Sequence, residues 1–377
     1  MIQAPLPLAT VIAVTVALCF WLDRHVPVLS KIGAGMLAIL VGAVLSNTGV
    51  VPATSPVYTA IEGPITYVAI AWLLLAVNIA DVRRVGRRVL GAFGLACVGT
   101  ALGAMIGAIL FSGAFGAENA KLAGAFTGTY TGGSVNFVSV SRGLSIPDTL
   151  FAAANAADAA ATALWMGATL LLPVWLARFY PPTPPPAQPV PGATDAEHPY
   201  FSGITLNTVD MALLVSSGLL LVLAANAAGR LVPGIPSVLW LTTFALAAGH
   251  LTPLGKVAGS LQFGNFALVF FFVVIGIHSR VAEILAVGVD VFWFTLIIVT
   301  VHGLVVFGFG RLFRIDVASL SVASQAAVGG PPSALAVAVA REWPQLVLPG
   351  VIVGLLGYAV GTYLGFGVGG LVRALGM

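Results

Sequence analysis

Charged residues are scarce in this chain. Only 8% of its 377 residues are Asp, Glu, Lys or Arg, whereas about a quarter of the residues are charged in soluble domains. A soluble protein of this length could not cover its surface with so few charges, and 59% of the residues are apolar. The composition therefore excludes a soluble protein and predicts an all-α polytopic membrane protein.

Other absences narrow the range of functions. Cys19 and Cys97 are the two cysteines, and both lie in apolar runs, where a thiol needs neither a disulfide nor a metal. The formal net charge of +3 is small and scattered, so nucleic acid is not expected as a partner. No Gly-x-x-x-x-Gly-Lys-Ser/Thr loop occurs, which argues against ATP-driven pumping by this chain.

Patterns typical of catalysis or metal binding are also missing. His250, His278 and His302 stand singly, without metal-ligand spacing. A membrane-embedded enzyme would need a nucleophile–base pair or a metal cluster within the spans. We therefore predict that the chain is not an enzyme and has neither a metal site nor a resident cofactor.

Long apolar runs fill most of the chain. A membrane-spanning helix needs about 20 apolar residues, and twelve segments approach that length. They lie near 5–22, 28–46, 60–80, 88–112, 119–142, 147–177, 209–228, 235–252, 260–281, 286–312, 317–341 and 345–372. The predicted domains are an N-terminal transmembrane repeat (1–178), a proline-rich linker (179–208) and a C-terminal transmembrane repeat (209–377).

Two landmarks recur at one offset in the two halves. Gly132-Gly133 and Gly329-Gly330 are 197 positions apart, and so are Pro147 and Pro344. The shared offset indicates a duplication. Arginines cluster after the third span and again after the tenth, and such clusters favour the cytoplasmic side. If both are cytoplasmic the repeats are inverted, which requires a miscounted span, so we expect eleven to thirteen crossings.

Each glycine pair lies inside an apolar segment amid polar side chains. Glycine lowers helix propensity by about 1 kcal/mol relative to alanine, and a broken helix in a membrane exposes main-chain groups that need partners. A half-helix that starts after the break favours an anion at its positive end. We therefore predict a substrate site lined by Thr129, Thr131, Gly132, Gly133, Ser134, Asn136, Gln325, Gly329, Gly330 and Ser333.

The sixth segment carries an aspartate near the middle of the membrane. Asn155, Asp158 and Thr162 share one helix face through their spacing of three and four. An ionisable residue at that depth usually faces a cavity and marks an ion or proton pathway. These three residues are the predicted ion-coupling site, and the sequence leaves open whether the ion is Na+ or H+. Asn265 in the ninth segment is a weaker candidate for lining a path.

At these residues the chain resembles a known membrane family, domain of unknown function 819 (YjcL-like). The resemblance is carried by the runs 128–136, 147–158, 325–344, 349–350 and 354–363. That family is grouped with the cation/proton antiporter and anion transporter superfamily. The resemblance implies a panel domain, a core domain with two crossing broken helices, and elevator-like alternating access. In sodium/proton antiporters of the superfamily an acidic pair follows the first broken helix, and Asn155 and Asp158 occupy the similar helix here.

Together these observations predict an ion-coupled secondary transporter in the cell (inner) membrane, carrying a small organic anion or zwitterion. The alternative is a cation/proton antiporter without an organic substrate. A membrane-embedded enzyme is the candidate from another class, and a channel is a further alternative. The expected partners are membrane lipid and a small-molecule substrate, with a homodimer as one possible assembly.

Overall fold

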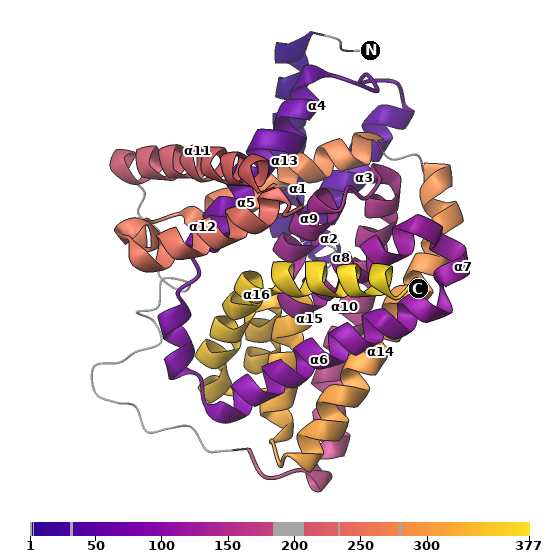
Figure 1. Cartoon of the computed structure of the whole chain (residues 1–377), viewed down its shortest axis with the longest axis vertical. Coiled ribbons are helices and arrows are strands. Elements are labelled where there is room, and N and C mark those ends of the chain that lie inside the picture. Colours follow the sequence, from indigo (N-terminus) through magenta and orange to yellow (C-terminus); the bar gives the residue numbers. More distant parts are fainter. Residues whose placement is uncertain (1, 3, 31–32, 184–206, 233, 279–280) are drawn as a thin grey trace.

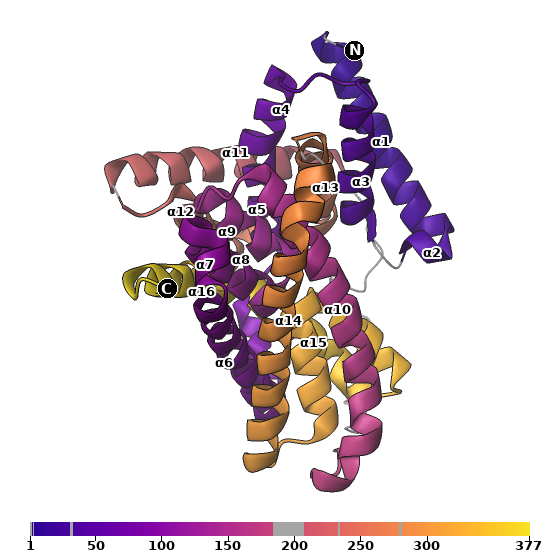
Figure 2. The same cartoon turned by 90° about the vertical axis from the view of Figure 1, so that its right-hand side faces the viewer.

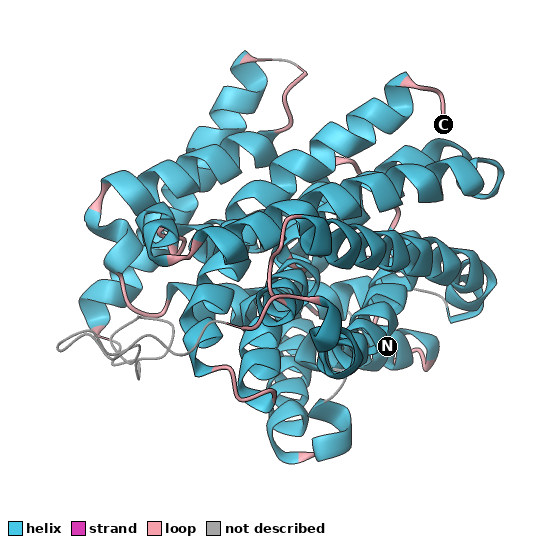
Figure 3. Cartoon of the chain, turned by 90° about the horizontal axis from the view of Figure 1, so that it is seen from below, coloured by secondary structure: helices cyan, strands magenta, loops and turns pink. Residues whose placement is uncertain are grey.

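The computed structural model describes the chain except residues 1, 3, 31–32, 184–206, 233 and 279–280. The described residues form helices joined by turns and loops, with no strand among them (Figures 1 and 3). The predicted all-α fold is therefore confirmed. Most of the predicted proline-rich linker lies outside the described residues.

The helices follow the predicted segments closely. Those of the first half are α1 (Pro5–His25), α2 (Pro27–Ser30), α3 (Gly33–Asn47), α4 (Pro56–Ala60), α5 (Thr66–Leu75), α6 (Arg87–Leu110), α7 (Ser112–Phe115), α8 (Asn119–Gly132), α9 (Ser134–Gly143) and α10 (Asp148–Leu176). Those of the second half are α11 (Thr208–Leu231), α12 (Ser237–Leu251), α13 (Ser260–His278), α14 (Val281–Leu312), α15 (Val317–Ala340) and α16 (Val347–Ala374). All twelve predicted segments contain helix, and the second contains both α2 and α3.

Eight helical segments within the described residues are long and apolar enough to cross a membrane. The other predicted segments are of two kinds. α3 and α12 are apolar but have only 15 residues each, and the remaining two are broken helices, α8 with α9, and α15. The protein is thus a multi-pass membrane protein, and the number of crossings stays a prediction.

The helices pack as two groups (Figure 2). In the first, called the α13 group, α13 packs on α3 and α5, α12 packs on α5 and α11, and α1 packs on α3. In the second, called the α15 group, α16 packs on α8 and α15, α14 packs on α6, and α10 packs on α14 and α15. Each group draws its helices from both halves of the chain.

Small residues let the first broken helix touch α16 directly. A methyl group on Gly132 would overlap the main chain of Gly357, and one on Gly124 would lie 2.8 Å from the carbonyl oxygen of Gly365. Membrane helices commonly use small residues to bring their backbones together in this way. This contact fixes α8 against α16, so the position of the break in α8 is set by helix packing.

Candidate functional site

Both glycine pairs break their helices with the same backbone conformation. Gly133 has φ 80° and ψ −172° between α8 and α9, and Gly330 has φ 73° and ψ −171° within α15. A side chain resists such positive φ values, whereas glycine adopts them readily. Both predicted breaks are therefore present, and in each pair the second glycine carries the unusual conformation.

The two breaks meet in space. A methyl group on Gly133 would lie 3.7 Å from both the Cα and the main-chain nitrogen of Gly330. The ring of Tyr358 in α16 lies next to both glycines, 3.8 Å and 3.6 Å from the corresponding methyl positions. The two broken helices thus approach each other at their non-helical residues, with the aromatic ring of α16 beside them.

Some main-chain groups at the breaks form hydrogen bonds with neighbouring residues. The Ser333 hydroxyl donates to the Gly329 carbonyl oxygen at 2.9 Å, across the second break. At the first break the Asn136 N–H donates to the Gly133 carbonyl oxygen at 3.1 Å. Pro331 and Pro332 have no N–H, so the second half-helix offers no main-chain donor at these two positions. The start of α9 is consequently the better of the two for binding an anion.

Asp158 of α10 reaches the residues at the first break. Thr129 Oγ1 donates to Asp158 Oδ2 at 3.5 Å, and Thr162 Oγ1 donates to Oδ1 at 3.4 Å. Both hydrogen bonds are long, because typical O–H···O distances are 2.5–3.0 Å. Tyr130, which the sequence analysis did not select, is buried beside Asp158 and interacts with it electrostatically. The Asp158 carboxylate thus lies beside the polar residues of the first break, with only long hydrogen bonds to the two threonines.

A cavity of about 750 Å³ lies at the two breaks. The α8–α9 break, the α15 break and α10 contribute most of its wall. The predicted residues that line it are Thr129, Gly133, Ser134, Asp158, Thr162, Gly329 and Ser333. Its remaining lining residues are small or apolar, among them Met166, Leu170 and Val328. The structure thus brings together polar groups from three predicted segments around one space.

A smaller cavity of about 290 Å³ shares part of this wall. Ser134, Asp158 and Ala159 line both cavities, and the smaller one is also lined by Asn155 of α10 and Asn265 of α13. Its other lining residues come mainly from α3 and α13, which belong to the α13 group. The aspartate therefore stands where two cavities adjoin, at the border between the helix groups.

The other predicted site residues pack between helices. Asn136 Nδ2 donates to the Gly357 carbonyl oxygen at 2.9 Å, and its Oδ1 accepts from Thr362 at 2.8 Å. Gln325 Oε1 accepts from Thr169 at 3.1 Å. Thr131 and Gly132 are buried in α8, and Gly330 lies where the breaks meet. Asn136 and Gly132 thus pack against α16, and none of the five is among the residues that line the cavity.

A chain of buried hydrogen bonds connects the helices around the site. Trp165 Nε1 donates to Ser324 Oγ at 2.9 Å, Ser324 lies 2.8 Å from His302 Nε2, and His302 Nδ1 lies 2.9 Å from Thr100 Oγ1. Thr100 donates to the Tyr130 carbonyl oxygen at 2.9 Å. The Thr100 hydroxyl has one proton, which it donates to the Tyr130 carbonyl oxygen, so Nδ1 of His302 is the donor in its contact with Thr100. The chain connects α6, α8, α10, α14 and α15.

Comparison with known proteins assigns the chain to a family. The chain is 28% identical over 370 residues to the "Uncharacterized membrane protein YjcL" of Bacillus subtilis (strain 168), covering 94% of this chain and 93% of that protein. The sequence model of the family described as "Protein of unknown function (DUF819)" matches residues 10–375. Since that match runs through both broken helices, α10 and α16, the chain belongs to the DUF819 family of membrane proteins.

Proposed function

We propose that this protein is an ion-coupled secondary transporter of a small organic anion or zwitterion. The observation that carries the proposal is the cavity at the meeting point of the two helix breaks, with Asp158 in its wall. Its volume of about 750 Å³ lies within the range of small-molecule sites, roughly 300–1,000 Å³. Discontinuous helices that meet at such a site are typical of secondary transporters.

The lining chemistry favours a small polar solute with a negative group. No Arg or Lys is among the described lining residues, so a carboxylate would be held by hydroxyls and by the N-terminal end of α9. Thr129, Ser134 and Ser333 supply hydroxyl groups. Met166, Leu170 and Val328 provide an apolar surface for the rest of the solute.

Asp158 is the proposed coupling residue. A carboxylate beside Asn155, Thr129 and Thr162 offers only oxygen ligands for a hard cation such as Na+. The same carboxylate can instead carry a proton, because intramembrane acidic residues commonly serve in proton relays. The proposal includes both ions as candidates.

Alternating access is proposed to come from movement of one helix group against the other. Both breaks and Asp158 belong to the α15 group, while the smaller cavity is closed mainly by α3 and α13. A displacement of the α15 group would carry the whole binding site and change which helices of the α13 group cover it. This motion corresponds to the elevator-like mechanism that resemblance to the antiporter superfamily implies.

The decisive experiment compares Asp158→Asn with wild type in proteoliposomes. Candidate solutes are first screened for thermal stabilisation of the detergent-solubilised protein, with and without Na+, and a stabilising solute is then used for uptake. We expect Asp158→Asn to abolish ion-driven uptake while leaving the unfolding temperature near that of wild type. Asp290→Asn is the matched control, because Asp290 is an exposed carboxylate on α14. Unchanged ion-driven uptake in Asp158→Asn would remove Asp158 from the mechanism.

The second candidate function is a cation/proton antiporter without an organic substrate. The two long hydrogen bonds to Asp158 favour it, because they leave the carboxylate available for an exchanging cation or proton. A pH-sensitive dye in vesicles distinguishes the candidates. Na+-driven proton flux without any added solute supports the antiporter, whereas flux that requires a solute supports the transporter.

A further inference from the structure

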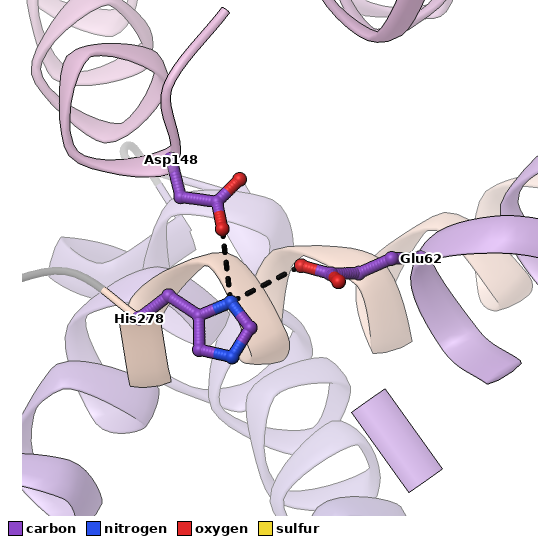
Figure 4. A group of neighbouring side chains, drawn as sticks. All are labelled: Glu62, Asp148 and His278. Carbon is purple, nitrogen blue, oxygen red and sulfur yellow. Dashed lines mark hydrogen bonds and ion pairs between the residues drawn. The ribbon is translucent and has the colours of Figure 1, made fainter. Parts of the chain in front are cut away.

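A cluster of metal-ligating side chains lies apart from both cavities (Figure 4). Glu62 belongs to the π-helical turn Ile61–Ile65 before α5, Asp148 is the first residue of α10, and His278 ends α13. One carboxylate oxygen of each acid and a ring nitrogen of the histidine all lie within 4.8 Å of one another. Because the three residues are distant in sequence, ligand spacing along the chain could not reveal them.

The geometry around His278 leaves one acceptor unsatisfied. Nδ1 of His278 lies 2.9 Å from Asp148 Oδ2 and 3.2 Å from Glu62 Oε1 (Figure 4). A ring nitrogen carries at most one proton, which it can direct well at only one of these oxygens. Glu62 Oε1 is buried and receives no hydrogen bond from the described residues. A cation at the centre would contact all three atoms at once.

Arg142 at the end of α9 contacts two of the ligand residues and orients the carboxylate of Asp148. Its Nη1 lies 3.8 Å from Asp148 Oδ1, the oxygen that does not face His278. Its Nη2 donates to the main-chain carbonyl oxygen of Glu62 at 3.3 Å. Carboxylates that bind metals are usually held by such outer partners. Arg142 is therefore a positioning residue that leaves Oδ2 directed at the centre of the cluster.

We propose that Glu62, Asp148 and His278 bind one divalent transition-metal ion, with Zn²⁺ as the best match. One imidazole and two carboxylates are a known Zn²⁺ ligand set, with bonds of about 2.0–2.2 Å that place tetrahedral ligand atoms roughly 3.4 Å apart. The separations of 2.9 and 3.2 Å from His278 Nδ1 need to widen only slightly, and the two carboxylate oxygens lie within 4.8 Å of each other. The imidazole ligand makes Mg²⁺ and Ca²⁺ poorer candidates, because both ions prefer oxygen ligands.

The site remains accessible to water. The side chains of Glu62, His278 and Asp148 keep 15%, 21% and 29% of their surface exposed. His278 ends one candidate span and Asp148 begins another, so the cluster is expected near the membrane surface. Water can supply the fourth ligand and a path for the ion.

A bound ion would join the two helix groups. Glu62 and His278 are carried by segments that pack in the α13 group, whereas Asp148 begins α10 of the α15 group. Metal binding is therefore expected to raise the unfolding temperature. If the groups move as the proposed function requires, the same ion inhibits transport, and only this last expectation rests on that function.

The test is direct titration of the purified full-length protein. Zn²⁺ binding is measured by calorimetry, and Co²⁺ binding by its visible absorption. We expect one equivalent to bind wild type, and His278→Ala and Asp148→Asn to weaken binding by at least about tenfold. His250→Ala is the matched control because His250 is exposed at the end of α12, and it should bind like wild type.

Glu62→Gln keeps the inference testable if His278→Ala does not fold, since it preserves side-chain size while removing the charge. No saturable binding by wild type, or unchanged binding in the three cluster variants, would overturn the inference. Loss of binding in His250→Ala would place the metal elsewhere and would also overturn it. Absence of solute transport with intact Zn²⁺ binding would reject the proposed function alone.

Discussion

At the scale of single residues, the two glycines of each pair have different tasks. Gly133 and Gly330 need their positive φ values, whereas Gly132 is helical and packs against the main chain of Gly357. The sequence shows the pairs but cannot distinguish these tasks, because close approach depends on a helix more than 200 positions away. For the same reason Asn136 was predicted to bind substrate, although its amide joins α9 to α16.

Replacing these glycines separates backbone strain from packing. Gly133→Ala has room for a methyl group, since its nearest neighbour would be 3.7 Å away, but must keep φ at 80°. We expect it to lower the free energy of unfolding by about 1–3 kcal/mol. Gly132→Ala overlaps main chain and should be more damaging. Thermal unfolding in detergent measures both, and Gly94→Ala in α6, with open space around it, serves as control. Equal stability of all three variants would contradict this account.

At the scale of elements, hydropathy located the helices well. An apolar run in a membrane must hydrogen-bond its own main-chain groups, and a helix does so. It could not reveal the π-helical turn Ile61–Ile65, where Pro64 cannot donate to the preceding turn. Nor could it reveal that His302, which stood alone in the sequence, connects α14 to α6 and α15 through Thr100 and Ser324. Such partners are determined by tertiary packing between helices distant in the chain.

Removing the ring of His302 should weaken this connection between helices. His302→Leu removes one hydrogen bond from each of Thr100 and Ser324, which keep their bonds to Tyr130 and Trp165. Each lost hydrogen bond is expected to lower the free energy of unfolding by about 0.5–1.5 kcal/mol. Thr295→Val on the same helix is the control, because Thr295 donates to the Val291 carbonyl oxygen of its own helix. A double-mutant cycle with Ser324→Ala measures the coupling. Additive losses of stability would show that the hydrogen-bond chain contributes nothing beyond its separate members.

At the scale of the whole molecule, the two helix groups each combine three segments from either half of the chain. The shared offset of the glycine and proline landmarks predicts a duplication, and this duplication stays a prediction. Orientation of the repeats stays a prediction. Side-chain periodicity alone could not have assigned helices to groups, because nearly every long segment is apolar along most of its surface.

A disulfide between the groups should stop the proposed movement. α9 packs on α8 and α16 of the α15 group and also contacts α12. A methyl group on Gly143 of α9 would lie 2.7 Å from Val238 Cγ1 of α12 and would overlap the ring of Phe366. Gly143→Cys with Val238→Cys can therefore bridge the α15 and α13 groups once the Phe366 ring turns aside. We expect oxidation to abolish solute uptake, and reductant to restore it. Gly229→Cys with Ser237→Cys lies within the α13 group and is the control. Full uptake by the oxidised intergroup variant would exclude relative movement at this contact.

The shared wall at Asp158 has a consequence for leakage. Because Ser134, Asp158 and Ala159 line both cavities, an ion bound at the carboxylate would border both spaces. Under the proposed function, a fixed ratio of ions to solute molecules transported then requires that water never fill both cavities in the same conformation.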